Sequence, residues 1–223
     1  MTRQNYRDAL DDLRADVLTM GELVVDQLAD GMTALRTGDE ELARQVIDRD
    51  AEVNETYLAL EQQCIDLFAL QQPVAGDLRL IAASFKIITD LERIGDLATN
   101  LGEYALAAEA TFAPAVAVDD IGEAARSMVG RSLDAYADRD TDACRQIDAD
   151  DERIDAMCED ASETVARELI DYDAVEEPGL DDFIEGVSRL LLTIRDLERV
   201  ADHAVNIAAR TLYMIDNDPE LVY

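Results

Sequence analysis

The sequence predicts an all-α protein in which six helices form two tandem, internally repeated three-helix bundles. Only four prolines and ten glycines occur among 223 residues, and the abundance of Ala, Leu, Arg, Glu and Asp favours helix over sheet. No two-residue turn of the kind that joins paired strands lies between alternating apolar segments. The strongest observation is a duplication, because residues 90–100 return as residues 196–206 with seven of eleven positions identical.

The first half of the chain predicts three helices. Apolar residues at helical spacing indicate a first helix over residues 5–35. A second helix is expected from residue 40 to about residue 71, and a third, which carries the repeated segment, from residue 77 to about residue 109. The boundaries lie at residues that break or cap helices, namely Thr37, Gly38, Asp39, Pro73, Gly76 and Asp77.

The second half predicts the same order of helices, over residues 119–137, 141–172 and 181–216. Residues 46–54 correspond to 147–155 at an offset of 101, whereas the repeated segment has an offset of 106. The loop between the second and third helices is therefore about five residues longer in the second half. These correspondences divide the chain into a first repeat, a linker and a second repeat, at residues 1–113, 114–118 and 119–223.

Each copy of the repeated segment predicts an acidic stripe on its helix. Glu92, Asp96 and Asn100 are spaced four residues apart, so they lie within an arc of roughly 80°. The apolar residues of the same helix lie on a different arc. The second copy repeats the pattern with Glu198, Asp202 and Asn206.

Oxygen ligands on adjacent helical turns can bind hard or borderline cations, and a neighbouring helix can complete the coordination shell. We pair the first stripe with Asp50 and Asn54, and the second with Asp151 and Asp155. In so acidic a chain, the same spacing also suits a solvated surface stripe that binds no metal. Both interpretations stay open at this point.

The net charge of −32 excludes some partners and favours others. It opposes direct binding of nucleic acid, and it favours cations. Because the acid is spread along every predicted helix, the composition resembles that of proteins from salt-accumulating organisms. Three cysteines without CxxC spacing suit a reducing cytoplasm. The polar N-terminus and the lack of a long apolar segment predict a soluble cytoplasmic protein.

No catalytic motif is found, so we predict that the protein is not an enzyme. The sequence has no glycine-rich phosphate loop, no GxSxG and no HExxH. Arg93 and Arg199, which follow each motif glutamate, are expected to form intramolecular ion pairs. His203, the only histidine, is either a metal ligand or an exposed bystander. The cysteines are expected to pack as small apolar side chains.

The sequence resembles the PhoU family of phosphate-uptake regulators. Residues 72–79 (QPVAGDLR) resemble the loop into that family's third helix, and residues 197–208 (LERVADHAVNIA) resemble its most recognisable segment. The resemblance implies two three-helix bundles side by side, with acidic motifs that bind multinuclear iron or zinc clusters. It also implies a cytoplasmic, non-enzymatic negative regulator of an ABC phosphate importer. The implied partners are the ATPase subunit of the importer and a phosphate-responsive signalling protein, so contact with the membrane is indirect.

The two halves depart from one another within this pattern. Asn54 stands where the second half has Asp155, and Leu97 stands where it has His203. The two sites are therefore not assumed to be equally occupied. A homodimer is compatible with a flat pair of bundles, although no residue requires it.

Two rival functions are considered. A ferritin-like di-iron protein needs Glu-x-x-His pairs that project into the core, but the residue three before His203 is Val200. A metal-free acidic helical adaptor would share the predicted fold. Amide substitution of the motif carboxylates separates that adaptor from a metal-binding protein.

Overall fold

A computed structural model describes residues 3–70, 75–107, 116–171, 180–218 and 221. These residues form six α-helices and contain no strand, which confirms the predicted fold class. The helices are α1 (Arg3–Thr37), α2 (Glu40–Leu70), α3 (Ala75–Ala107), α4 (Val118–Asp138), α5 (Thr141–Asp171) and α6 (Leu180–Asp216).

The helix boundaries agree with the sequence prediction to within a few residues. α3 begins at Ala75, two residues before the predicted Asp77, and α4 begins at Val118, inside the predicted linker. Several predicted features lie outside the described residues. They are Pro73, residues 114–115 of the linker, residues 173–179 of the loop before the last helix, and the predicted helix ends near Gln71, Glu109 and Tyr172.

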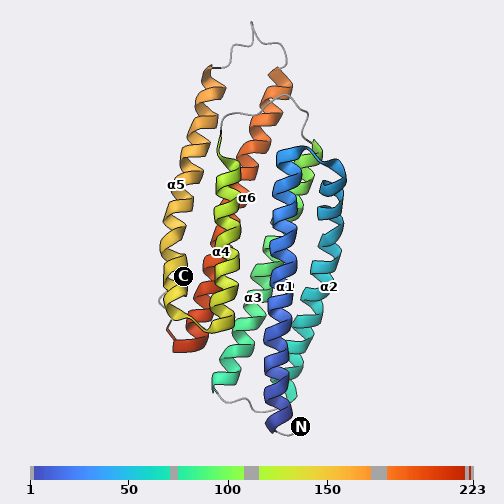
Figure 1. Ribbon diagram of the computed structural model, residues 1–223, viewed down its shortest axis with the longest axis vertical. Helices are drawn as coiled ribbons and strands as arrows, with labels where there is room; N and C mark the ends of the chain where they lie inside the picture. Colours follow the sequence, from blue (N-terminus) through green and yellow to red (C-terminus); the bar gives the residue numbers. More distant parts are fainter. Residues whose placement is uncertain (1–2, 71–74, 108–115, 172–179, 219–220, 222–223) are drawn as a thin grey trace.

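The six helices form two neighbouring groups of three (Figure 1). α3 contacts α1 and α2, while α6 contacts α4 and α5. The groups meet where α3 runs antiparallel to α6 and where α1 touches α4. No helix in the described part of the chain is long and apolar enough to cross a membrane.

One hydrophobic core continues through both groups of helices. Tyr136 of α4 is fully buried, and its hydroxyl lies 2.7 Å from the Ser84 hydroxyl of α3. The guanidinium of Arg14 on α1 donates to the carbonyl oxygens of Tyr136 and Ala137 at the end of α4. The groups therefore share packing and polar contacts, because each repeat needs the other to cover its central helix. All three cysteines are buried and unpaired, as predicted for small apolar side chains.

An ion pair between the first and second helices occurs at equivalent positions in both repeats, with the acid and the base exchanged. Asp30 of α1 pairs with Arg49 of α2 at 2.9 Å. At positions 101 residues later, Arg131 of α4 pairs with Asp150 of α5 at 2.5 Å. The acid and the base have exchanged helices, yet the contact between first and second helices is retained.

The two repeats also share the turn between their first and second helices. Asp39 caps α2 by accepting hydrogen bonds from the backbone N–H groups of Glu41 and Leu42. Asp140 accepts the corresponding bonds at the start of α5. The residue before each capping aspartate is left-handed, with φ of 67° at Gly38 and 57° at Arg139.

Replacing Arg139 with glycine should stabilise the protein. A non-glycine residue in the left-handed region costs roughly 1 kcal/mol, whereas glycine adopts this conformation without steric cost. We expect Arg139→Gly to raise the free energy of unfolding by about 0.5–1 kcal/mol, measured by urea denaturation. The matched substitution Gly38→Arg should lower it by a similar amount. Equal stabilities for both variants and the parent protein would contradict this account of the turn.

Candidate metal centre

The acidic motif residues lie on the central helices, which contact the outer helices α2 and α5. We name two groups of residues by the repeat that holds them. The first site comprises Asp50, Asn54, Glu92, Asp96 and Asn100, and the second site comprises Asp151, Asp155, Glu198, Asp202 and Asn206.

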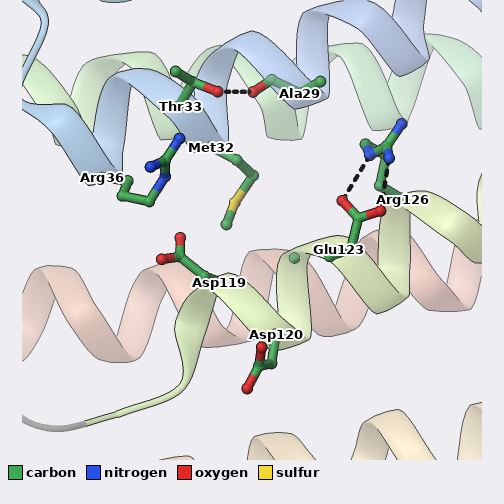
Figure 2. Close-up of a pocket in the computed structure, with 9 residues that line it drawn as sticks. Ala29, Met32, Thr33, Arg36, Asp119, Asp120, Glu123 and Arg126 are labelled. Atoms are coloured by element: carbon green, nitrogen blue, oxygen red, sulfur yellow. Dashed lines mark hydrogen bonds and ion pairs between the residues drawn. The ribbon is translucent and has the colours of Figure 1, made fainter.

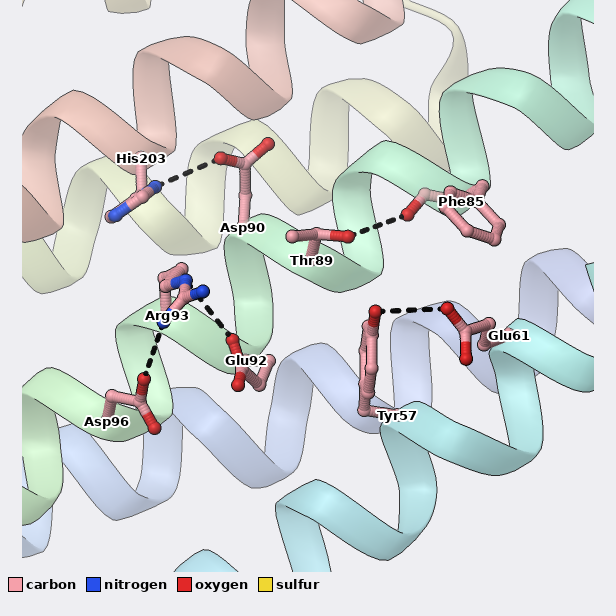
Figure 3. Close-up of polar contacts among 9 residues, drawn as sticks. All are labelled: Tyr57, Glu61, Phe85, Thr89, Asp90, Glu92, Arg93, Asp96 and His203. Carbon is pink, nitrogen blue, oxygen red and sulfur yellow. Dashed lines mark hydrogen bonds and ion pairs between the residues drawn. The ribbon is translucent and has the colours of Figure 1, made fainter.

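In the first site, an arginine lies between the two motif carboxylates (Figure 3). Arg93 Nε is 3.5 Å from Glu92 Oε2, and Arg93 Nη1 is 3.2 Å from Asp96 Oδ2, which confirms the predicted ion pairing. Burial and the charge of Asp96 raise the pKa of Glu92, and Asp50 adds to this increase while Arg93 opposes it. The effect of Asp50 indicates that α2 brings its carboxylate near those of α3.

A chain of hydrogen bonds holds Asp50. Asn54 Nδ2 donates to Asp50 Oδ2 at 2.9 Å, and the Thr99 hydroxyl lies 3.5 Å from Asp50 Oδ1. Gln27 of α1 is fully buried, and its amide nitrogen donates to Thr99 Oγ1 at 3.1 Å and to the Val46 carbonyl at 3.0 Å. Neither Gln27 nor Thr99 was predicted from the sequence to support this site. A signal for Gln27 existed, because it is a polar residue on the otherwise apolar stripe of α1.

Asn100 reaches across to the other repeat. Its amide nitrogen donates to Asp196 Oδ2 at 3.0 Å, and the Tyr104 hydroxyl donates to the same oxygen at 2.9 Å. Asn100 therefore lies at the contact between α3 and α6, and its side chain does not bond Asp50. In the second site, Asn206 is half-buried, and no hydrogen bond of its side chain is found among the described residues.

The first aspartate of each motif lies in the same contact between repeats. Asp90 and Asp196 are 8% and 5% exposed. His203 Nδ1 lies 2.9 Å from Asp90 Oδ1 (Figure 3). His203 is thus not an exposed bystander, because its Nδ1 lies within hydrogen-bond distance of the buried Asp90 carboxylate. Identity at positions 90 and 196 was visible in the sequence, but their burial was not.

The second site gathers four carboxylates. Burial raises the pKa of Asp151 to about 6, with added repulsion from Asp155, Asp202, Asp148 and Glu198. Burial and the charge of Asp155 also raise the pKa values of Glu198 and Asp202. Arg195 opposes the increase at Glu198, and His203 and Arg199 oppose it at Asp202. In the described part of the chain, no arginine forms an ion pair with the four carboxylates of the site, and Arg199 instead lies 3.7 Å from Asp196.

One carboxylate oxygen of the second site lacks a partner. Asp151 Oδ1 is buried and has no hydrogen-bond partner among the residues that the structure describes. An unpaired buried carboxylate oxygen is costly, which makes it a natural ligand for a cation. The nearby Cys158 thiol points instead toward the Ile194 carbonyl, 3.9 Å away, and burial raises its pKa to about 12.

The carboxylates are near one another without forming a closed coordination shell. Among the described residues, no three Asp, Glu, His or Cys side chains converge tightly enough to hold a metal ion. Like charges repel, so side chains of this kind spread apart unless a cation draws them together. The donors are all oxygens, and the buried free oxygen of Asp151 fits a cation. The second site therefore fits a metal ion better than the first.

A separate hollow contains arginines but has no excess of positive charge (Figure 2). It has a volume of about 610 Å³ and lies between α1 and the start of α4. Arg126 is held by both carboxylate oxygens of Glu123, at 3.1 and 2.7 Å. Arg36 faces the same hollow as Asp119 and Asp120. Because three carboxylates line it beside two guanidinium groups, this hollow is not suited to an anion such as phosphate.

Replacing Asp151 with asparagine should stabilise the protein above neutral pH. The pKa of Asp151 in the folded protein, about 6, exceeds the ordinary value of 3.8. The carboxyl group therefore makes its full contribution to the free energy of unfolding below pH 3.8, and this contribution is lost as pH rises through 6. Screening reduces the effect, so we expect Asp151→Asn to gain about 1 kcal/mol above neutral pH.

The measurement is urea unfolding with chelator present, and the gain of Asp151→Asn should vanish near pH 4. The matched variant Asp50→Asn should show no such gain, because Asp50 already accepts hydrogen bonds from its neighbours. A gain for Asp151→Asn that is equal at both pH values would contradict the role assigned to burial and repulsion of the Asp151 carboxylate.

Comparison with known proteins places the chain in a family. The PhoU domain matches residues 17–105 and again residues 118–211, so one domain description fits each repeat. The chain is 37% identical to a "phosphate-specific transport system accessory protein PhoU homolog" from Pseudomonas putida, over 95% of this chain and 81% of that protein. It is 33% identical to the accessory protein PhoU of Escherichia coli strain K12, over 94% of this chain and 85% of that protein.

Solved structures agree with this comparison. The crystal structure of PhoU from Pseudomonas aeruginosa matches with a TM-score of 0.85 at 34% identity, covering 96% of this chain and all of that one. The phosphate transport system regulatory protein PhoU from Streptococcus pneumoniae matches with a TM-score of 0.88 at 27% identity, covering 98% of this chain and 99% of that one. With both repeats matched and the fold shared, the chain belongs to the PhoU family.

Proposed function

We propose that this protein is a metal-binding regulator of inorganic phosphate uptake. It would act on the cytoplasmic side of an ABC phosphate importer, contact the ATPase subunit and lower uptake when phosphate is plentiful. The observation that carries the regulatory part is membership of the PhoU family along nearly the whole chain. The relatives are named as accessory or regulatory proteins of phosphate transport, which accords with a protein that is not an enzyme.

The unpartnered Asp151 oxygen supports the metal-binding part of the proposal. Asp151 and Asp155 of α5 and Glu198 and Asp202 of α6 would hold an ion such as iron or zinc, and Asp50, Glu92 and Asp96 would be the counterparts in the first repeat. A bound cation would supply positive charge that offsets the repulsion among these carboxylates. It would also join an outer helix to a central helix in each repeat, which makes the shape of the bundle depend on metal.

A metal-free acidic adaptor is the second candidate function. It is favoured by the open arrangement of the carboxylates, since no three ligand side chains converge in the described part of the chain. The ferritin-like alternative gains no support, because the single histidine bonds Asp90 and is not paired with a motif glutamate. A signalling partner, a homodimer and adaptation to high salt stay predictions.

Amide substitution of the motif carboxylates should remove the metal. We expect protein purified in concentrated salt without chelator to contain more than one iron or zinc ion per chain by elemental analysis. A variant with Glu92→Gln, Asp96→Asn, Glu198→Gln and Asp202→Asn should lose this metal and keep its helical circular dichroism.

A matched control keeps the same change in charge. It carries Asp11→Asn, Asp12→Asn, Glu22→Gln and Asp134→Asn, which alter exposed carboxylates of α1 and α4. This control should retain the metal of the parent protein. Folded protein without metal in all three samples would instead favour the adaptor.

Deletion of the gene should raise phosphate uptake in cells supplied with ample phosphate. The physical reason is loss of a protein that docks on the importer and slows it. The measurement is uptake of labelled phosphate under replete and starved conditions, with the parent gene restored as a control. Unchanged uptake under both conditions would disprove the regulatory proposal.

A further inference from the structure

We propose that the two sites are unequal, because Arg93 acts as an internal cation that competes with metal at the first site. The inference rests on the proposed metal binding. It concerns two arginines that occupy equivalent positions in the repeats but contact different carboxylates.

Arg93 already compensates part of the negative charge of the first site. Arg93 contacts both Glu92 and Asp96, at 3.5 and 3.2 Å. Arg93 and Arg199 also line one hollow of about 310 Å³, together with Asp50 and Asp96. A cation that binds these carboxylates therefore faces two guanidinium groups.

The first site also has one carboxylate fewer than the second, and its Asp50 is already hydrogen-bonded within the protein. Asn54 supplies an amide where the second site has Asp155. Asp50 accepts a hydrogen bond from Asn54 and lies beside the Thr99 hydroxyl, which is held in turn by the buried Gln27. In the second repeat, the equivalents of Gln27 and Thr99 are Met128 and Val205, which cannot form these bonds. Asp151 is thus left with an unpartnered oxygen.

The different behaviour of the two arginines follows from the contact between repeats. Arg199 turns toward Asp196, 3.7 Å away. The acid equivalent to Asp196 for Arg93 is Asp90, but His203 Nδ1 lies 2.9 Å from Asp90 Oδ1. The first repeat has Leu97 at the position equivalent to His203. On Asp196, Asn100 and Tyr104 bond Oδ2, and Arg199 lies against the other oxygen, Oδ1. Arg93 pairs instead with the motif carboxylates Glu92 and Asp96.

The consequence is a difference in charge around chemically similar ligands. The second site presents four carboxylates with no arginine paired to them in the described part of the chain. The first presents three, with Arg93 bound to two of them. The second site binds a cation more tightly. The first site binds one only when the Arg93 side chain moves away from Glu92 and Asp96.

Binding of Mn²⁺, which prefers oxygen ligands, tests this inference. Free Mn²⁺ is measured by its electron paramagnetic resonance signal in concentrated KCl. A protein with only the first site carries Glu198→Gln and Asp202→Asn, and a protein with only the second site carries Glu92→Gln and Asp96→Asn. We expect the second-site protein to bind Mn²⁺ about tenfold more tightly, since each screened charge contributes only a few-fold.

Arg93→Gln, added to the first-site protein, should tighten Mn²⁺ binding roughly three- to fivefold. Arg93→Lys should leave the binding weak, because it keeps the positive charge. Arg199→Gln, added to the second-site protein, is the matched control and should change the affinity less than twofold. Arg93 is exposed, so its variants are expected to fold, which circular dichroism checks.

Equal affinities of the two single-site proteins would overturn the inference and leave the proposed metal binding intact. Tight binding in the first-site protein that Arg93→Gln does not change would do the same. Absence of Mn²⁺ binding in both proteins and in the parent would overturn the metal-binding proposal together with the inference.

Discussion

The antiparallel contact between α3 and α6 determines the geometry of the whole molecule. Two carboxylates are nearly buried in it: Asp90, which meets His203, and Asp196, which meets Asn100 and Tyr104. Leaving a buried hydrogen-bonding group without its partner costs about 1–3 kcal/mol, and more when the group is charged. These contacts therefore favour one rotation and one register of the two helices. The remaining faces of α3 and α6 are then left for their outer neighbours, which places the acidic stripes beside α2 and α5.

The two repeats are more alike in the packing of their helices than in the polar contacts between them. Both repeats use an aspartate to cap the second helix, and both hold the first helix to the second with an ion pair. The acid and base of that pair have exchanged positions between the repeats. Either arrangement provides the same attraction, so a contact of this kind tolerates exchange as long as both partners change. Apolar packing sets the fold, while the polar contacts around each site are free to diverge.

Because the two sites differ in sequence, the repeats differ in how the negative charge of their carboxylates is compensated. The first repeat offsets the charge with Arg93 and with hydrogen bonds to Asp50. The second leaves its carboxylates without an arginine ion pair among the described residues, and burial together with their mutual repulsion raises the pKa of Asp151 to about 6. In a chain with a net charge of −32, such local differences matter, because the surrounding field already disfavours further negative charge. The repeats thus share a fold but differ in how strongly they attract cations.

The sequence by itself determined the helical fold, the duplication and the two acidic stripes, because helical spacing and identity between segments are local properties. It also anticipated the ion pairing of Arg93 and the burial of the cysteines. Only the tertiary structure decided that one core joins both repeats, that His203 meets Asp90, and that Gln27 supports Asp50 through Thr99. These contacts join residues that lie 49–113 positions apart. Periodicity along one helix indicates which face is polar, but the partner of each polar group depends on how separate helices pack.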